Sequence, residues 1–299
     1  MSEKNYIIRK NKKDISALLD KGNEYMNHND YAGAIEFFKR AVELRPKDKN
    51  ALYILADFYK RLGELNQAKR CYTSIINNHP LDTETYISRC AVNLNNGDYI
   101  EALSDVNMAI MYQGKSTDLL FMRADIYSSL ELWDRAIDEY TKIYNQATVK
   151  SEALLGRAYC YQSKGEYEQA IQDLSEAIEI SPNDYIFYCH RSINYLRVEK
   201  IHNAVADAEK SVELGEYPES YYVRALTYAS AGKPQQALID VKTTLDLDQV
   251  GALNLEKHFL NEPGFYPLQT SPRYKGLLES HFGVEIPGLA DETIKTAGE

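Results

Sequence analysis

Small and large apolar residues alternate with polar residues along most of the chain at the three- and four-residue spacing of amphipathic helices. The pattern itself repeats with a period of about 34 residues, and one alanine returns in each of seven units without exception. A fixed period of this length predicts an array of stacked units rather than a single compact core. The alanines are Ala34, Ala68, Ala102, Ala136, Ala170, Ala204 and Ala237.

The half of each unit that precedes the alanine has its own signature. A small residue recurs there, and three residues later comes a position that holds tyrosine in six units and Asn93 in the third. Small residues let two helices approach closely, and large residues nearby fill the space beside them. Each unit is therefore predicted to be two helices, A and B, joined by a turn. The small residues are Gly22, Ala56, Cys90, Ala124, Ala158, Ser192 and Ala225.

Glycine and proline mark where these helices end. Glycine stands in the turn of most units, as at Gly97 and Gly165, where it allows the left-handed geometry that ends helix A. Units four and six lack this glycine, and in unit four Trp133 replaces the turn tyrosine. Unit six is also one residue short before Pro218, so a slightly irregular junction is expected there. Prolines follow helix B, where a helix must stop, at Pro46, Pro80 and Pro182.

This combination of residues resembles the tetratricopeptide repeat family. The resemblance rests on the small residue and tyrosine of helix A, the turn, and the alanine, aromatic and proline residues of helix B, and it covers roughly residues 15–251. It implies an all-α fold, a right-handed α-solenoid of about seven helix–turn–helix repeats with a C-terminal capping helix region. The expected repeats are 15–48, 49–82, 83–116, 117–150, 151–184, 185–217 and 218–251.

The two ends of the chain lack the repeat signature. Residues 1–14 are expected to form a basic leader before the first helix. Residues 252–286 keep apolar periodicity and are expected to cap the last repeat, because a terminal unit must present a polar outside. Residues 287–299 are expected to be disordered.

A pattern of opposite charges is confined to repeats three to seven. Each has an arginine just before the small residue of helix A and an acid three residues after the alanine of helix B, whereas repeats one and two have neither. Because the arginine and the acid occur together or not at all, we expect them to form an ion pair within each repeat. The alternative is that the arginines bind a carboxylate group of a ligand. The predicted pairs are Arg89 with Asp105, Arg123 with Glu139, Arg157 with Asp173, Arg191 with Asp207, and Arg224 with Asp240.

The resemblance also implies where a partner binds. In this family the A helices line the concave face of a superhelix, and targets bind there. The implied groove is apolar and aromatic with interspersed acids, although each of its residues could instead pack against the neighbouring repeat. Its residues are Leu19 and Asn23, Tyr53 and Asp57, Ile87 and Ala91, Phe121 and Asp125, Leu155 and Tyr159, Cys189 and Ile193, and Tyr222 and Leu226.

One known use of such a groove fits poorly. Co-chaperones of the family grip acidic chain ends with a carboxylate clamp of Lys, Asn and Arg on consecutive A helices. Asn23 matches one clamp position, but Leu19, Ile54, Glu84 and Ser88 occupy the others. The acids of the groove instead favour a peptide with apolar anchors and basic flanks.

Charge and motifs disfavour several other functions. The net charge of -10 argues against nucleic acid as the main partner, because phosphate binding needs a basic surface. The sequence has no GxxxxGK[ST] loop, no HExxH and no GxSxG motif, so neither an enzyme activity nor a cofactor or metal is predicted. No apolar run is long enough to span a membrane. The four cysteines are widely spaced, and a reducing, cytoplasmic location is expected.

The sequence therefore predicts an interaction scaffold or adaptor that holds a peptide segment of a partner protein in the concave groove. A chaperone or co-chaperone that shields an apolar client segment is the alternative. Shielding predicts broad binding to unfolded chains, whereas a scaffold has one or few partners. Self-association stays open, because arrays of this type can pair through terminal repeats.

Overall fold

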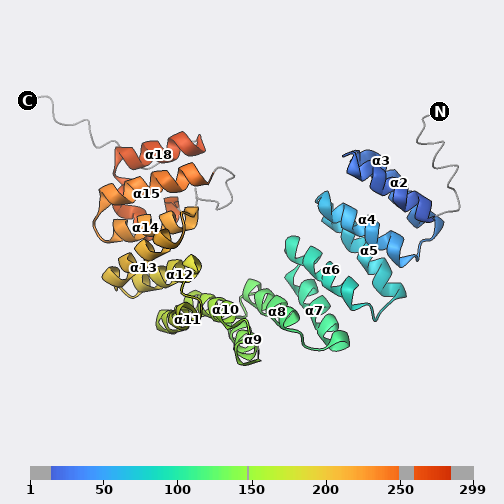
Figure 1. The fold of residues 1–299 in the computed structure, drawn as a ribbon, viewed down its shortest axis with the longest axis horizontal. Coiled ribbons are helices and arrows are strands. Elements are labelled where there is room, and N and C mark those ends of the chain that lie inside the picture. The colour runs from blue at the N-terminus through green and yellow to red at the C-terminus, as the bar shows by residue number, and fades with distance from the viewer. Residues whose placement is uncertain (1–14, 147, 249–258, 284–299) are drawn as a thin grey trace, which may run out of the picture. The chain divides into compact units, whose positions relative to one another are not determined.

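The computed structural model of the 299-residue protein describes residues 15–146, 148–248 and 259–283. Within those ranges every regular element is a helix, and A and B helices alternate along the chain (Figure 1). The expectations for the leader at 1–14 and for the tail at 287–299 lie outside the described residues. The same holds for the parts of the expected cap before residue 259 and after residue 283.

Seven A helices each precede a B helix. The A helices are α2 (Ile15–Asn27), α4 (Lys49–Arg61), α6 (Thr83–Asn95), α8 (Thr117–Ser129), α10 (Lys150–Ser163), α12 (Tyr185–Arg197) and α14 (Pro218–Ser230). The B helices are α3 (Tyr31–Leu44), α5 (Leu65–Asn78), α7 (Tyr99–Gln113), α9 (Trp133–Gln146), α11 (Tyr167–Ile180), α13 (Ile201–Leu214) and α15 (Pro234–Leu247). The chain forms two compact units, residues 1–139 and 140–299, and the division falls inside α9.

One backbone arrangement ends the A helix in all seven repeats. A residue with positive φ follows the helix, and the next N–H donates to the carbonyl oxygen at the tyrosine position. In repeat five Gly165 has φ 79°, and the N–H of Glu166 lies 2.9 Å from the carbonyl oxygen of Tyr161. This is the bond that closes a Schellman turn. Glycine takes the left-handed position in four repeats, and in the other three it is taken by Asn29, Glu131 and Glu199, with φ of 59°, 57° and 57°.

The repeated small residues mark where helices A and B touch. All seven alanines of helix B are fully buried. A Cβ atom on Gly22 would lie 2.3 Å from the ring of Phe38, so the ring can lie against this backbone only because residue 22 is glycine. In repeat six the Ser192 hydroxyl donates to the carbonyl oxygen of Ala204 on the facing helix at 2.8 Å. The 34-residue period is therefore the signature of one helix-to-helix contact made seven times.

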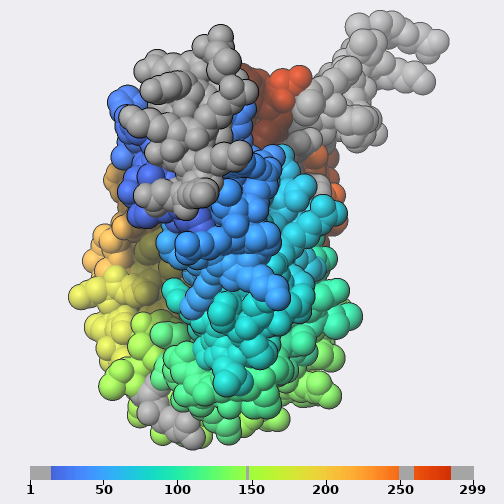
Figure 2. All heavy atoms as spheres, turned by 90° about the vertical axis from the view of Figure 1, so that its right-hand side faces the viewer, coloured from blue at the N-terminus to red at the C-terminus, as the bar shows by residue number. Residues whose placement is uncertain are grey.

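Repeats one and two of the first unit share an aromatic core. Phe37, Phe38 and Tyr72 are fully buried. Phe38 meets Phe58 edge-on at 5.3 Å between ring centroids, and Tyr53 meets Tyr72 in the same way at 5.5 Å. Figure 2 shows the outside of this unit, where the repeats from blue to cyan form a continuous packed surface.

In the second unit, three short elements pack on the last repeat. They are the 3-10 turn η1 (Pro263–Phe265), α17 (Tyr266–Gln269) and α18 (Pro272–Phe282). Phe259, Phe265 and Tyr274 are fully buried in one cluster with apolar side chains of α14 and α15. The Tyr274 hydroxyl donates to the carbonyl oxygen of Phe259 at 2.7 Å. These elements therefore withdraw the apolar end of the repeat array from water.

Candidate functional site

Each arginine of repeats three to seven forms an ion pair with the acid of its own repeat. In the first unit Arg89 Nη2 lies 2.6 Å from Asp105 Oδ1, and Arg123 Nη2 lies 3.0 Å from Glu139 Oε2. All five acid side chains are at most 10% exposed. In the second unit the arginines each donate two bonds of 2.7 or 2.8 Å, in the pairs Arg157 with Asp173, Arg191 with Asp207, and Arg224 with Asp240.

These pairs keep the guanidinium groups charged inside the protein. A hydrogen bond to the partner carboxylate raises the pKa of Arg157, Arg191 and Arg224 and outweighs the opposing effect of partial burial. Aromatic rings add to this, since Arg191 lies over the rings of Tyr188 and Tyr195 at 5.8 and 5.7 Å. The arginines are thus engaged in joining helix A to helix B, which does not favour their use as ligand-binding residues.

The sequence reasoning missed a third partner of these arginines. Nη1 of Arg89 donates to the Thr73 hydroxyl of the preceding B helix at 3.0 Å, and Arg123 makes the same contact with Asn107 at 3.0 Å. In the second unit the partners are Thr141 for Arg157 and Ser175 for Arg191. The partner always lies sixteen residues before the arginine, so this spacing is the signal that could have found it. In repeats three to six the arginine therefore also ties its repeat to the one before it, whereas Arg224 of repeat seven hydrogen-bonds only Asp240 among the described residues.

Three of the predicted partner-binding residues line one pocket in the first unit. Asn23, Tyr53 and Asp57 are lining residues of a pocket of about 200 Å³. The other residues that line it are Met26, Phe38, Ile54, Phe58 and Arg61. Pockets for small molecules usually have volumes of about 300–1,000 Å³, so this one suits a single side chain better than a whole cofactor.

The polar residues of this pocket are held by bonds among the A helices. Asp57 accepts hydrogen bonds from Lys60 at 3.1 Å and Arg61 at 2.9 Å. Burial works against charge on Asp57, but these bonds outweigh it and lower its pKa. The hydroxyl groups of Tyr53 and Ser88 are 2.7 Å apart, which links α4 to α6. The pocket therefore has apolar walls and a polar rim whose charges are already balanced.

Most of the other predicted groove residues are accessible to some degree. In the first unit Ile87 of α6 and Phe121 of α8 are half-buried, and Asp125 is exposed. In the second unit the Tyr159 side chain is 49% exposed on α10. Leu155 and Ile193 are half-buried on α10 and α12. We call these residues the A-helix face of each unit: Asn23, Tyr53, Asp57, Ile87, Phe121 and Asp125 in the first unit, and Leu155, Tyr159 and Ile193 in the second.

Four predicted groove residues are packing residues instead. Leu19 is 5% exposed and belongs to the same buried cluster as Leu52, so its assignment to the binding surface is wrong. Tyr222 meets the rings of Phe259 and Phe265 at 5.4 and 5.6 Å, so residues of the cap occupy that position of the last repeat. Cys189 and Leu226, which share groove positions by resemblance, are buried as well. Leu19, Cys189 and Leu226 are withdrawn from water at contacts between neighbouring elements, whereas Tyr222 is half-buried against the cap.

Two observations on the described residues concern metal binding and thiol chemistry. It contains no group of three or more His, Cys, Asp or Glu side chains placed to hold a metal ion. Burial raises the pKa of the Cys71 and Cys189 thiols to about 11, so both are protonated near neutral pH and unreactive. No helix in the described ranges has the length and apolar character needed to cross a bilayer.

Comparison with known proteins identifies the repeats. Residues 25–86 and residues 151–184 each match a family described as tetratricopeptide repeat. The chain contains tetratricopeptide repeats. Members of this family generally mediate protein–protein interactions, and their repeats are typically non-catalytic scaffolds.

The relatives share repeats with this chain over part of their length. Human serine/threonine-protein phosphatase 5 is 38% identical over 100 residues, which are 33% of this chain and 20% of that protein. Human sperm-associated antigen 1 is 23% identical over 240 residues, which are 75% of this chain and 24% of that protein. The chain thus spans a quarter or less of these tetratricopeptide repeat relatives, and the phosphatase match shows no catalytic domain.

A solved structure has the same fold. A tetratricopeptide repeat protein from Parabacteroides merdae superposes with a TM-score of 0.65 and covers 83% of this chain and 99% of its own. The two sequences are 24% identical, so the likeness concerns the fold alone. It agrees with a tandem helix–turn–helix α-solenoid.

Proposed function

We propose that this protein is an interaction scaffold whose A-helix face binds a peptide segment of a partner protein. The pocket between α2 and α4 is the observation that carries the proposal. It combines the apolar side chains of Phe38 and Phe58 with polar atoms at its rim, and it has the size to admit one side chain of a peptide. An apolar anchor residue in such a pocket excludes water and contributes most of the binding free energy.

The charges along the A helices support a basic flank next to that anchor. At the pocket itself Asp57 is paired with Lys60 and Arg61, so no excess negative charge is left there. Further along the first unit, Glu84 on α6 and Asp118 on α8 are exposed, and so is Asp125. A Lys or Arg that follows the anchor would meet these carboxylates and gain electrostatic attraction.

The second unit offers a similar surface of its own. Tyr159 on α10 is about half exposed, and Glu152 at the start of the same helix is exposed. Tyrosine is a frequent anchor at interfaces because its ring buries a large area while its hydroxyl still bonds. The four cysteines are free thiols, which supports a reducing compartment such as the cytoplasm for this interaction.

A peptide selection on the full chain tests the proposal and needs no identified partner. Random peptides displayed on phage are selected for binding, and the affinities of the selected peptides are measured by fluorescence polarisation. We expect peptides with an apolar anchor and adjacent Lys or Arg. Asn23→Trp, which fills the pocket, and Glu84→Lys, which reverses a flanking charge, are each expected to weaken binding about tenfold.

Ile239→Ala is the matched control, because Ile239 is 58% exposed on the B helix α15. Its removal should leave peptide affinity unchanged. Peptides that lose affinity with Ile239→Ala but not with Asn23→Trp would contradict the proposed surface. Equal binding of unrelated unfolded chains would instead favour client shielding over scaffolding.

A further inference from the structure

The outward faces of α5 and α11 carry opposite chemistry at equivalent positions. Exposed residues on α5 are Asn66, Arg70 and Asn77, which we call the α5 face. The residues at the equivalent positions of α11 are Glu168, Gln172 and Glu179, which are exposed and which we call the α11 face. Each residue of the second set lies three repeats after its counterpart in the first. Two helices with the same backbone geometry thus present a donor-rich surface and an acidic one.

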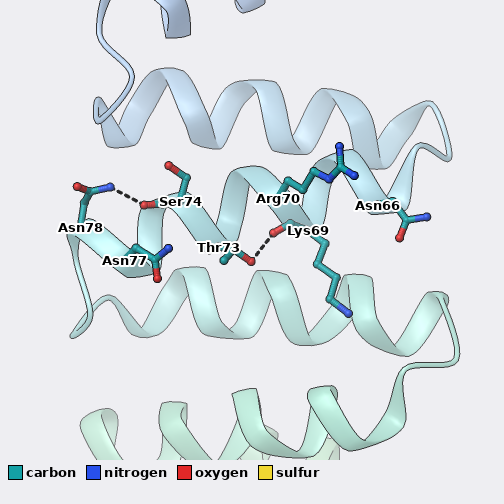
Figure 3. Close-up of a pocket in the computed structure, with 7 residues that line it drawn as sticks. All are labelled: Asn66, Lys69, Arg70, Thr73, Ser74, Asn77 and Asn78. Atoms are coloured by element: carbon teal, nitrogen blue, oxygen red, sulfur yellow. Dashed lines mark hydrogen bonds between the residues drawn. The ribbon is translucent and has the colours of Figure 1, made fainter.

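The helix α5 lacks acidic residues, although the protein as a whole is acidic. The helix sequence LNQAKRCYTSIINN contains no Asp or Glu, unlike every other B helix. Residues 49–82 hold five Lys and Arg but three Asp and Glu, whereas the whole chain has a net charge of -10. The helix borders a hollow of about 600 Å³ (Figure 3). Its lining residues are Asn66, Lys69, Arg70, Thr73, Ser74, Asn77 and Asn78.

The donors of the α5 face are available to a partner. Lys69 is paired with Asp98 at 2.7 Å. Arg70, by contrast, has no ion pair with any described residue, and the side-chain amides of Asn66 and Asn77 have no hydrogen bond there. An unpaired guanidinium flanked by two amides is suited to bind carboxylates.

The α11 face supplies carboxylates in the same spacing. Glu168 and Glu179 are exposed and have no ion pair with the described residues, whereas Glu176 of the same helix is bonded by the Tyr144 hydroxyl. Residues 151–184 hold seven Asp and Glu but two Lys and Arg. This repeat is therefore a strong local source of negative charge in the array.

An exposed apolar side chain is present in or near the repeat of each face. Ile180, at the end of α11, is 44% exposed. Ile100, near the start of α7, is 73% exposed. Asp98, two residues before it, is paired with Lys69 of α5. An interface that joined the two faces would also cover these side chains, which adds apolar burial to the charge attraction.

We propose that the α5 face of one molecule binds the α11 face of a second copy of this chain. Arg70 and its neighbouring amides meet Glu168 and Glu179 of the second copy. The contact is proposed to run head to tail rather than as a reciprocal pair, so each molecule in a pair keeps one face of each kind for a further copy. Association through B helices leaves the A-helix face open to a peptide, so the two interactions are independent.

Sedimentation equilibrium of the full chain tests the proposal. It is run over rising protein concentration at about 0.01 M and about 1 M ionic strength, where the Debye length is about 30 Å and about 3 Å. The expected result at low salt is a mean mass that increases steadily with concentration, without a plateau at the dimer. At high salt the protein should return to the monomer mass.

Two variants reverse the charge of one face each. Arg70→Glu and the double variant Glu168→Lys/Glu179→Lys should each weaken association about tenfold. Mixed in equal amounts they should again form complexes at low salt, because the first keeps its α11 face and the second keeps its α5 face. Lys242→Glu is the control, since it makes the same charge change at an exposed position of α15.

Several results would overturn the proposal. A monomer at every concentration in low salt is one, and a discrete dimer plateau, which indicates a closed pair instead of a head-to-tail contact, is another. Equal weakening by Lys242→Glu would mean that net charge alone governs association. Circular dichroism of each variant, together with the milder Arg70→Gln, separates lost folding from lost contact.

Discussion

Repeats one and two hold their helices together differently from repeats three to seven. Phe37 and Cys71 stand where the later repeats have an acid, and Lys21 and Leu55 stand where those repeats have an arginine. The helix-to-helix contact of small residues is nevertheless the same in all seven. The comparison shows that small residues determine how closely the two helices of a repeat approach. The neighbouring contact between helix A and helix B can be apolar or ionic, provided that the residues at the arginine position and at the acid position change together.

The aromatic region should be most sensitive to loss of volume. Phe38→Ala removes a fully buried ring that lies against Gly22 and Phe58. It is expected to cost about 3–5 kcal/mol through lost burial and the cavity left behind. Hydrogen exchange of amides in α2, α3 and α4 measures this locally, which suits an array that need not unfold in one step.

Ile100→Ala is the control in the same unit, because Ile100 is mostly exposed. Its cost should stay within about 0.5 kcal/mol. A similar effect of both substitutions would mean that Phe38 is not a core residue.

In repeats three to seven, removing one residue of an Arg–acid ion pair should lower the free energy of unfolding. Asp173→Asn leaves the charge of Arg157 without its carboxylate in a mostly buried place, and is expected to cost about 3 kcal/mol. Arg157→Leu combined with Asp173→Cys copies the pair Leu55 and Cys71 of repeat two. This double variant should recover most of the loss, because apolar residues can replace an ion pair when both partners change. Denaturant unfolding of the three proteins gives the comparison.

The double variant Arg157→Leu/Asp173→Cys is the more decisive part of that experiment. If the double variant were as unstable as Asp173→Asn, the two kinds of repeat would not be interchangeable. If Asp173→Asn cost nothing, the ion pair would be irrelevant to stability.

The smallest expected effect concerns the turns. Glu131 and Glu199 adopt the left-handed conformation that glycine takes in four other repeats. Replacing each by glycine is expected to stabilise the protein by about 0.5–1 kcal/mol, because a side chain is strained there. The reverse change, Gly165→Ala, should destabilise by a similar amount. Thermal unfolding of the variants measures both, and a lower midpoint for Glu131→Gly would contradict the strain argument.

Much of the fold could be predicted because the same contact between helix A and helix B recurs in all seven repeats. The alanines and small residues report the helix pair directly, and the matched absence of Arg and acid in repeats one and two identifies the partners of the ion pairs. The turns of repeats four and six keep the same geometry without glycine, because the bond from the residue after Glu131 or Glu199 to the preceding helix fixes the backbone.

The parts that could not be predicted depend on the neighbours of a residue. Leu19 and Tyr222 occupy groove positions by repeat register, yet one is enclosed by the next repeat and the other is covered by the cap. The bonds from Arg89 to Thr73 and from Arg191 to Ser175 cross between repeats, so a pattern defined within a single repeat does not contain them. The pocket at Asn23 and Asp57 arises from side-chain shapes of three helices that periodicity does not specify.

The most direct test of the central claim is hydrogen exchange of the full chain with and without a selected peptide. If the A-helix face binds the partner, exchange should slow in α2 and α4 while the B helices α5 and α7 remain unchanged. Slower exchange confined to α5 and α7, with none in α2 or α4, would contradict the assignment of binding to the A helices.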